Sequence, residues 1–373
     1  MLDPQEHGTV QVQITRREAI GRVAGAGLGL LMLLNPEGST AGSPAQALGQ
    51  PTPPPPDPRY PTPSTWETEL KEIGPNIYSY IQGGGPGRDN LGRSNAGIIV
   101  GENGILVIDS LAAPIHAKNF IAAIRNVSDK PFRHLVYTHH HGDHVGGGQY
   151  FAGAEIIGHP YCRQEVVKMA VTAPTLWAKR DGWAEGTELE TILPPVTTYD
   201  NKVSYYYGKN TIEVFPMAPA HTYGDLVIYM PQHKLLFAGD VGFFNVAPFC
   251  QNANPSSWID ICNKINEMDV QMIVPGHGPL GGKAELSDMR DYLVQLKKEA
   301  RTRYDAKISA GAAAADIRMG KFDNWVGPER IVMDVQRFYL EFSGKLTPNV
   351  DAEGIRQATE DYNTARRTIP NGG

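Results

Sequence analysis

The densest group of reactive side chains in the sequence is the stretch LVYTHHHGDHVGGGQYF, residues 135–151. His139 and His141 lie two residues apart after an apolar run, so an extended backbone would point both side chains to one side. Asp143 and His144 follow a glycine, which lets the chain turn between the two pairs. Imidazole and carboxylate groups together suit zinc or a similar first-row divalent ion. The stretch therefore predicts two groups of metal ligands on one loop.

This loop alone supplies too few ligands for a catalytic metal, which keeps three protein ligands and an open position for water. The missing ligands are expected at the ends of later strands. Three polar residues follow apolar runs there: His221 in APAHTYGD, Asp240 in FAGD and His277 in VPGHG. We expect these three side chains to complete the site begun by the histidine loop.

Two similar sets of elements would position these residues. Short apolar runs bounded by glycine indicate strands, and wider apolar spacing indicates helices. The first set has strands at 76–82, 95–101 and 104–110, a helix at 113–127 and a strand at 132–138; the second has strands at 210–219, 225–231 and 234–240, a helix at 256–269 and a strand at 271–278. Each set ends in a strand whose carboxyl end carries histidine. The pattern predicts an α/β fold with two sheets packed face to face and helices outside.

The two ends of the chain differ from this central part. Residues 1–47 read as an export signal, because Arg16 and Arg17 precede a Gly, Ala and Leu run too short to span a bilayer, and SPAQA offers a cleavage pattern. The proline-rich residues 48–65 are expected to form an extended linker. Residues 66–282 are the predicted catalytic domain, and residues 283–373 a helical extension packed on it.

Composition limits the partners of the protein. The chain has 373 residues, a formal net charge of −6 and a pI near 6.0, so it lacks the basic surface that nucleic-acid binding requires. Its three cysteines, Cys162, Cys250 and Cys262, have no ligand spacing, which argues against a disulfide framework or a cysteine zinc site. We expect a small-molecule substrate, no nucleic acid and no membrane span once the signal is removed. The sequence does not fix the oligomeric state.

The ligand set resembles that of the metallo-β-lactamase superfamily, over roughly residues 76–280. The resemblance implies an αββα sandwich with a binuclear metal site at one edge. It assigns His139, His141 and His221 to the first metal, Asp143, His144 and His277 to the second, and Asp240 to a bridge between them. It also implies that Asp109, at the end of ILVIDS, supports the histidine loop through the other nitrogen of a metal-bound imidazole. Thr138 is expected to shape the loop by hydrogen bonding.

Within that superfamily, THHHGDHVGG and the aspartate at position 240 resemble the glyoxalase II-like branch. The N-terminal arginine pair resembles a twin-arginine export signal, which implies a periplasmic or secreted enzyme. The implied cofactor is two zinc ions, with iron and manganese as alternatives. The implied reaction is hydrolysis of an ester, lactone, thioester or amide bond by a hydroxide that bridges the metals. Asp143 would orient this hydroxide and pass a proton to the leaving group.

Other functions remain open on the same residues. The two-metal site would also suit phosphoester or phosphotriester hydrolysis. Iron in the same fold would suit redox chemistry, in a persulfide dioxygenase or a diiron oxygen reductase. A non-catalytic periplasmic accessory of a quinoprotein system is the alternative outside enzymes.

Substrate contacts are expected from loops outside the ligand set. The glycine-rich stretch at 82–95 carries Arg88 and Arg93, which could meet an anionic substrate. Aromatic residues near the ligand segments predict an apolar wall around the mouth of the site: Trp177, Trp183, Tyr205, Phe243 and Phe244.

Overall fold

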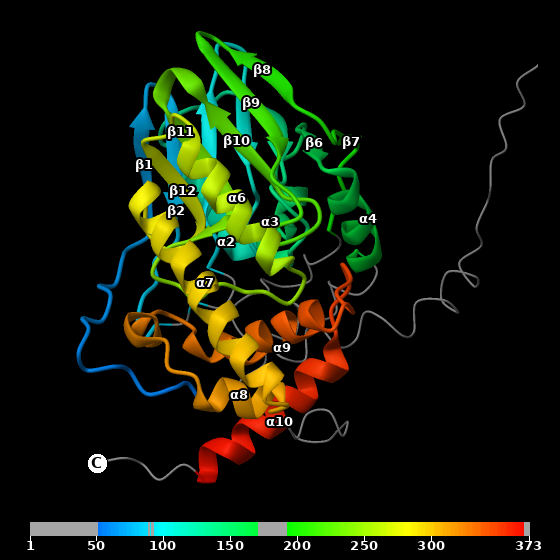
Figure 1. Cartoon of the computed structure of the whole chain (residues 1–373). Coiled ribbons are helices and arrows are strands. Elements are labelled where there is room, and N and C mark those ends of the chain that lie inside the picture. The colour runs from blue at the N-terminus through cyan, green and yellow to red at the C-terminus, as the bar shows by residue number, and fades with distance from the viewer. Residues whose placement is uncertain (1–50, 89, 91–92, 171–191, 369–373) are drawn as a thin grey trace, which may run out of the picture.

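The computed structural model describes residues 51–368, apart from residues 89, 91–92 and 171–191. Two β-sheets lie face to face in it, and helices cover their outer faces (Figure 1). This arrangement is the αββα sandwich predicted from the sequence, with a helical C-terminal region. The predicted export signal, residues 1–47, lies outside the described residues. Among the described residues, no helix is both long and apolar enough to cross a membrane.

The first sheet has seven strands in sequence order, and its direction changes from antiparallel to parallel at β4. Its strands are β1 (Glu69–Gly74), β2 (Ile77–Ile81), β3 (Ala96–Val100), β4 (Ile105–Ile108), β5 (Phe132–Val136), β6 (Glu155–Gly158) and β7 (Thr197–Thr198). Because β4 and β5 are parallel, their carboxyl ends meet at the same edge of the sheet.

The second sheet has five strands in the order β12-β11-β10-β9-β8. Its strands are β8 (Val203–Tyr207), β9 (Asn210–Pro216), β10 (Leu226–Met230), β11 (Leu235–Phe243) and β12 (Met272–His277). Only β11 and β12 pair in parallel in this sheet. Each sheet thus has antiparallel neighbours followed by a helical crossover to a parallel strand, as the two similar sets in the sequence predict.

An apolar layer fills the space between the sheets. Ile99, Leu106 and Val136 from the first sheet pack there with Ile228 and Phe237 from the second. These side chains are at most 2% exposed, so their burial contributes most of the free energy that holds the sheets together.

Helices follow the strands on both outer faces. The α-helices are α2 (Pro114–Arg125), α3 (Gly142–Val145), α4 (Pro160–Met169), α6 (Pro255–Glu267), α7 (Lys283–Asp305), α8 (Ala310–Asp316), α9 (Ile331–Phe342) and α10 (Ala352–Thr368). The 3-10 helices are η3 (Gly148–Tyr150), η4 (Pro231–His233), η5 (Gly320–Asn324) and η6 (Pro328–Arg330). Buried residues of α2 and α4 pack on the first sheet, and those of α6 and α7 pack on the second.

Helix α6 shows why these residues form a helix on that face. The Asn254 side chain accepts a hydrogen bond from Ser257 N at 3.2 Å and caps the first turn. Trp258, Ile261, Cys262 and Ile265 then recur at helical spacing and are all buried. This apolar stripe docks the helix on the second sheet.

The last helices form a layer at one end of the sandwich (Figure 1). Buried residues of α8, α9 and α10, including Ala313, Phe338 and Tyr362, belong to the same apolar cluster as Trp258 of α6 and Phe243 of β11. The C-terminal helices therefore share a core with the second sheet.

The proline-rich segment runs along these helices before it reaches β1 (Figure 1). The Asn324 side chain donates to the Asp57 and Tyr60 carbonyl oxygens at 3.0 and 2.7 Å. The Tyr362 hydroxyl donates to Thr52 O at 2.7 Å. Residues 52–60 are thus held on the C-terminal layer by specific bonds.

Asp334 of α9 gives a testable link between this layer and the sheet. Its carboxylate accepts from Cys250 N at 3.0 Å and from the Tyr292 hydroxyl at 2.9 Å. Burial raises the pKa of Asp334 to about 7. Between about pH 4, the ordinary value for aspartate, and pH 7, the folded protein holds a proton that the unfolded chain releases. The free energy of unfolding should therefore fall across this window as the pH rises.

We expect Asp334→Asn to remove this pH dependence, since its amide oxygen can still accept from Cys250 N while its NH₂ donates to the Tyr292 hydroxyl. Relative to the variant, the wild-type free energy of unfolding should fall by up to about 1.4 kcal/mol per pH unit across the window. Urea unfolding at a series of pH values measures the difference. Asp288→Asn on the exposed side of α7 is the control and should leave the wild-type profile unchanged. Parallel profiles for wild type and Asp334→Asn would show that Asp334 does not titrate there.

Candidate metal centre

The histidine loop follows β5 at the edge where the parallel strands end. His139 lies in a bend after the strand, His141 is the N-cap residue of α3, and α3 then carries Asp143 and His144. The three histidines are at most 8% exposed. The chain changes direction between the two ligand pairs, as predicted, because α3 begins at Gly142.

Three other segments bring polar side chains to the same place. His221 lies between β9 and β10, Asp240 lies inside β11, and His277 ends β12. All three are at most 6% exposed. The fold thus brings these three side chains to one edge although they are far apart along the chain.

Gly239 explains how a strand can place Asp240 among the histidines. The pairing of β11 with β12 shifts register on both sides of Gly239, whose φ is 52°. A Cβ on this residue would lie 2.6 Å from Thr138 Cβ. A left-handed backbone in contact with a neighbour favours glycine, and such bulges re-aim adjacent side chains.

The seven predicted ligands come together in two adjoining groups. Ligand-type atoms within each group all lie within 4.8 Å of one another, the groups being His139, His141, His221 and Asp240, and Asp143, His144 and His277. Asp240 also reaches the second group, because its oxygens lie 3.0 Å from His144 Nε2 and 3.3 Å from His277 Nε2. Asp240 thus lies between the two groups.

The atoms that face this centre suit a divalent cation. His139 Nε2, His144 Nε2 and Asp240 Oδ1 are buried and have no hydrogen-bond partner within the described chain. Buried polar atoms are almost always paired, so such a cluster indicates a missing partner. Imidazole nitrogens with carboxylate oxygens are the donors that zinc prefers. The residues therefore fit a divalent metal site.

The charges of the side chains are complementary within the centre. Burial, together with the neighbouring histidine His144, holds the pKa of His139 well below its ordinary value, so this imidazole stays neutral. Burial alone would raise the pKa of Asp240, but the imidazoles of His277 and His144 outweigh it and hold that pKa well below its usual range. His139 and Asp240 are thus in the forms that bind metal. The carboxylates around His144 and His277 outweigh burial and raise the pKa of both imidazoles, so a divalent ion would have to displace their protons.

Asp109 is hydrogen-bonded to the histidine loop at three points. Its carboxylate accepts from His144 Nδ1, from Thr138 N and from the Thr138 hydroxyl, each at 2.8 Å. Thr138 thus shapes the loop by hydrogen bonding, as expected. Because Nδ1 of His144 carries the proton that it donates, Nε2 is left free to face the centre.

The structure adds supporting residues that sequence reasoning missed. The Asn252 side-chain oxygen lies 3.0 Å from His141 Nε2. The Ser94 hydroxyl donates to Asp143 O, and the Asn95 side chain donates to Pro275 O and Gly278 O at 2.9 and 2.8 Å. A clue was available for the last two, because SN directly precedes a buried strand beside the glycine-rich stretch. No spacing signal pointed to Asn252.

The predicted aromatic wall is wrong for the residues that can be placed. Phe243 and Phe244 are fully buried, and Phe243 stacks on His277 with ring centroids 4.8 Å apart. They lie behind the ligands because β11 continues past Asp240 as a buried strand. Tyr205 lies in β8 against His134, 4.9 Å between ring centroids. Trp177 and Trp183 lie outside the described residues.

The two predicted arginines have different surroundings. Arg88 donates to a Glu67 carboxylate oxygen at 2.6 Å and to Trp66 O at 3.3 Å. The segment just before β1 therefore holds this side chain. Arg93 is partly buried, with its Nε unpaired within the described chain. Arg93 precedes the Ser94 that anchors Asp143, whereas Arg88 is committed elsewhere.

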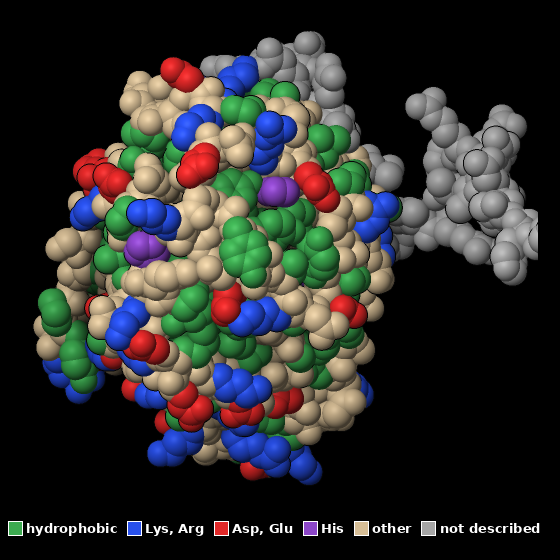
Figure 2. Space-filling view, turned by 90° about the horizontal axis from the view of Figure 1, so that it is seen from above, with side chains coloured by type: hydrophobic (Ala, Val, Ile, Leu, Met, Phe, Trp, Pro, Cys, Tyr) green, Lys and Arg blue, Asp and Glu red, His purple; other side chains and the backbone are tan. Residues whose placement is uncertain are grey.

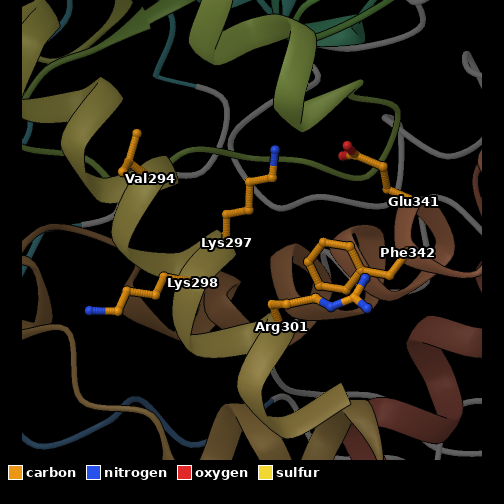
Figure 3. Close-up of a pocket in the computed structure, with 6 residues that line it drawn as sticks. All are labelled: Val294, Lys297, Lys298, Arg301, Glu341 and Phe342. Atoms are coloured by element: carbon orange, nitrogen blue, oxygen red, sulfur yellow. The ribbon is translucent and has the colours of Figure 1, made fainter. Parts of the chain in front are cut away.

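Two pockets lie away from the seven side chains. One, of about 590 Å³, lies between α7 and α9 and is lined by Lys297, Arg301 and Phe342 among others, with Arg301 5.1 Å from the Phe342 ring centroid (Figure 3). The other, of about 710 Å³, lies beside the β8–β9 hairpin and includes His134 and Tyr206. Figure 2 views the molecule from that end, where acidic and basic side chains divide the apolar ones. Neither pocket contains a predicted ligand.

Comparison with known proteins gives a family match over the same region. The family model described as the metallo-beta-lactamase superfamily matches residues 89–277, about half of the chain. The linear primary-alkylsulfatase of Pseudomonas sp. (strain ATCC 19151) is 21% identical over 227 residues, which are 52% of this chain and 43% of that protein. The chain thus spans less than half the length of this relative. The metallo-beta-lactamase type 2 of Bacillus cereus is 24% identical over 54% of this chain and 73% of that protein.

A solved structure extends the likeness in fold. The inverting sec-alkylsulfatase Pisa1 from Pseudomonas sp. aligns with a TM-score of 0.55 at 17% identity. The alignment covers 74% of this chain and 50% of that chain. The aligned share of the chain is therefore larger than the share that belongs to the predicted catalytic domain, residues 66–282.

We expect Asp109→Asn to weaken divalent-ion binding by the group that contains His144. An amide can accept from Thr138 N, but its NH₂ would then face His144 Nδ1–H, which forces the other tautomer and turns Nε2 into a donor. Loss of such a partner costs about 10- to 100-fold in metal affinity. Competition with a chromophoric chelator measures this affinity.

Asp323→Asn is the matched control, because Asp323 is a buried aspartate that accepts from Met319 N and Gly320 N, remote from the histidines. Its metal affinity should equal that of the wild type. Equal affinities for Asp109→Asn and wild type would contradict the supporting role of Asp109.

Proposed function

Because the chain belongs to the metallo-beta-lactamase superfamily, we propose that it is a metal-dependent hydrolase of a small molecule. The observation that carries this proposal is the convergence of seven buried or half-buried histidine and aspartate side chains from separate segments. Burying so many ionisable groups together is costly unless a cation compensates them. A structural histidine cluster would not need three buried ligand atoms without a hydrogen-bond partner in the described chain.

We propose two ions and zinc as their identity. The two groups of ligand atoms adjoin through Asp240, which is the geometry that a binuclear site needs. Imidazoles and carboxylates without any cysteine suit zinc, and also iron or manganese. When bound, two such ions would supply a hydroxide at neutral pH and a Lewis acid for the bond that is attacked.

The protein side chains would have different roles at the two ions. His139, His141 and His221 would hold one ion, and Asp143, His144 and His277 the other. Asp143 differs from the other ligands because 22% of its side chain is exposed, whereas Asp240 is 3% exposed. Asp143 is therefore the ligand placed to exchange a proton with a substrate. Its oxygen lies 3.2 Å from His277 Nε2, which would keep the carboxylate oriented.

The bond that we propose is an ester, lactone, thioester or amide. The aspartate at position 240 and the THHHGDH loop support a glyoxalase II-like site. A sulfate ester is the second candidate. It is favoured by one observation, namely that the likeness to a solved alkylsulfatase extends over more of this chain than the predicted catalytic domain. The same two-metal chemistry applies to either bond.

Metal removal tests the central proposal. We expect elemental analysis to find two zinc ions per chain, and we expect chelation to abolish hydrolysis that added zinc restores. Activity should be compared across aryl ester, lactone, thioester, β-lactam, phosphotriester and alkyl sulfate substrates. His139→Asn should lose metal, whereas His140→Asn, in the middle of the same triplet but outside both groups, should retain it. Two bound ions without turnover of any substrate would instead support the accessory role, and one iron would support redox chemistry.

Asp143→Asn separates the two roles of this residue. The amide oxygen can still reach an ion but cannot take up or release a proton at neutral pH. We expect zinc content to stay near the wild-type value at saturating zinc while kcat falls by about 10²- to 10⁴-fold, the range for general acid–base catalysis. Loss of zinc in parallel with activity would show that Asp143 acts only as a ligand.

A further inference from the structure

The starting point is the imidazole of His141, whose two nitrogens face different partners. Nδ1 faces the centre and lies 2.8 Å from His221 Nε2. Nε2 points the other way and lies 3.0 Å from Asn252 Oδ1. Because an amide oxygen can only accept, Nε2 must carry the hydrogen, and the lone pair of Nδ1 is then free for a metal. Asn252 thus sets the tautomer of this ligand.

The orientation of Asn252 is in turn fixed by the C-terminal region. Its Nδ2 donates to Pro348 O at 3.1 Å. A backbone carbonyl can only accept, so the NH₂ end must face Pro348 and the oxygen must face His141. Asn252 is 5% exposed, which leaves little room for water to replace either bond. Pro348 lies in the connection between α9 and α10.

One buried guanidinium joins the two segments that meet at this amide. Arg337 of α9 is 2% exposed. It donates to Ala253 O at 2.6 Å, to Thr347 O at 2.6 Å and to Asn349 O at 3.1 Å. These carbonyls belong to the residue after Asn252 and to both neighbours of Pro348. The planar fork of arginine can hold such a set rigidly, which a lysine ammonium cannot.

Two more side chains of the same helix region hold the loop that carries Asn252. Arg330 donates to Ala247 O at 2.7 Å, and Asp334 accepts from Cys250 N at 3.0 Å. Positions 330, 334 and 337 follow helical spacing, so the N-cap residue and one face of α9 contact residues 247–253 at three points. Figure 1 shows α9 in the layer beside the sandwich.

We propose that Asn252 is a positioning residue for the metal ligand His141, and that Arg337 couples the C-terminal helices to the metal centre by fixing Asn252 against Pro348. The inference rests on the proposed metal-binding function. In this proposal the C-terminal region orients a metal ligand, in addition to contributing to the apolar core. The outer partner of a metal-bound imidazole typically changes metal affinity by about 10- to 100-fold.

The test compares Asn252→Leu with Asn252→Asp by zinc affinity in chelator competition. Both variants lose the donor to Pro348 O, so any purely structural effect of that bond is common to them. Only aspartate keeps an acceptor for His141 Nε2–H. We expect the leucine variant to bind zinc about 10- to 100-fold more weakly, and the aspartate variant to stay much closer to wild type. Equal losses in both variants, or none in leucine, would overturn the positioning role.

A second measurement removes the influence of the charge that aspartate adds. In the cobalt-substituted protein, a metal-bound imidazole with a protected N–H gives a shifted, exchangeable proton resonance. We expect the wild type and Asn252→Asp to show one such resonance that Asn252→Leu lacks through rapid exchange with water. An unchanged set of resonances in the leucine variant would contradict the hydrogen bond. Thermal unfolding of the metal-free proteins checks that all variants fold.

Arg337→Lys tests the coupling to the helices. Lysine keeps the charge but cannot bridge three carbonyl groups, so zinc affinity should fall several-fold. Arg303→Lys is the control, since Arg303 lies in α7 and pairs with Glu299 and Asp316 away from residues 247–253. Wild-type affinity in Arg337→Lys would overturn the coupling. If the wild type binds no zinc, the proposed function and this inference both fail, whereas zinc binding without hydrolysis removes only the proposed function.

Discussion

One buried carboxylate, Asp240, is the group around which the other polar side chains are arranged. Its oxygens lie between 3.0 and 3.7 Å from nitrogens of His139, His144, His221 and His277. A carboxylate buried this deeply is stable only if cations or donors compensate it, so both sheets must deliver imidazoles to it. The backbone accommodates this demand through two glycines. Gly239 bends β11, and a Cβ at Gly276 would overlap the carboxylate itself.

The sequence allowed the fold and the ligand groups to be predicted because both depend on local signals. Each predicted ligand follows an apolar run, and strand ends of parallel pairs meet at one edge. The roles of Asn252 and Arg337 were not predicted, because their partners lie 111 and 84 residues away and no sequence spacing links them. The aromatic wall was wrong for Phe243 and Phe244 for a different reason. Aromatic composition does not reveal which face a side chain takes, and β11 stays buried on both faces to Phe243. The export signal and the domain boundaries remain predictions.

The two halves of the sandwich contribute unequal kinds of residue to the centre. The first half supplies the histidine loop and its support, Asp109, within one compact segment. The second half supplies single residues from three separate places, and it is this half on which α7 and the last helices pack. Relatives named as a lactamase and as a sulfatase each match about half of the chain. Differences in bond specificity within the superfamily are therefore expected to lie in segments outside the common ligand set.

The bonds between the proline-rich segment and the C-terminal helices constrain the order in which the molecule can be completed. Tyr362 and Thr52 are 310 residues apart, and Asn324 and Asp57 are 267 apart. The Asn324 bond cannot form until η5 has been synthesised, and the Tyr362 bond cannot form until α10 has been synthesised. By then all strands of the sandwich have been synthesised. During synthesis, residues 52–60 therefore remain unbound to the C-terminal helices. Any protein that binds the nascent chain encounters these residues in the unbound state. Docking of this segment reports that the last helix is in place.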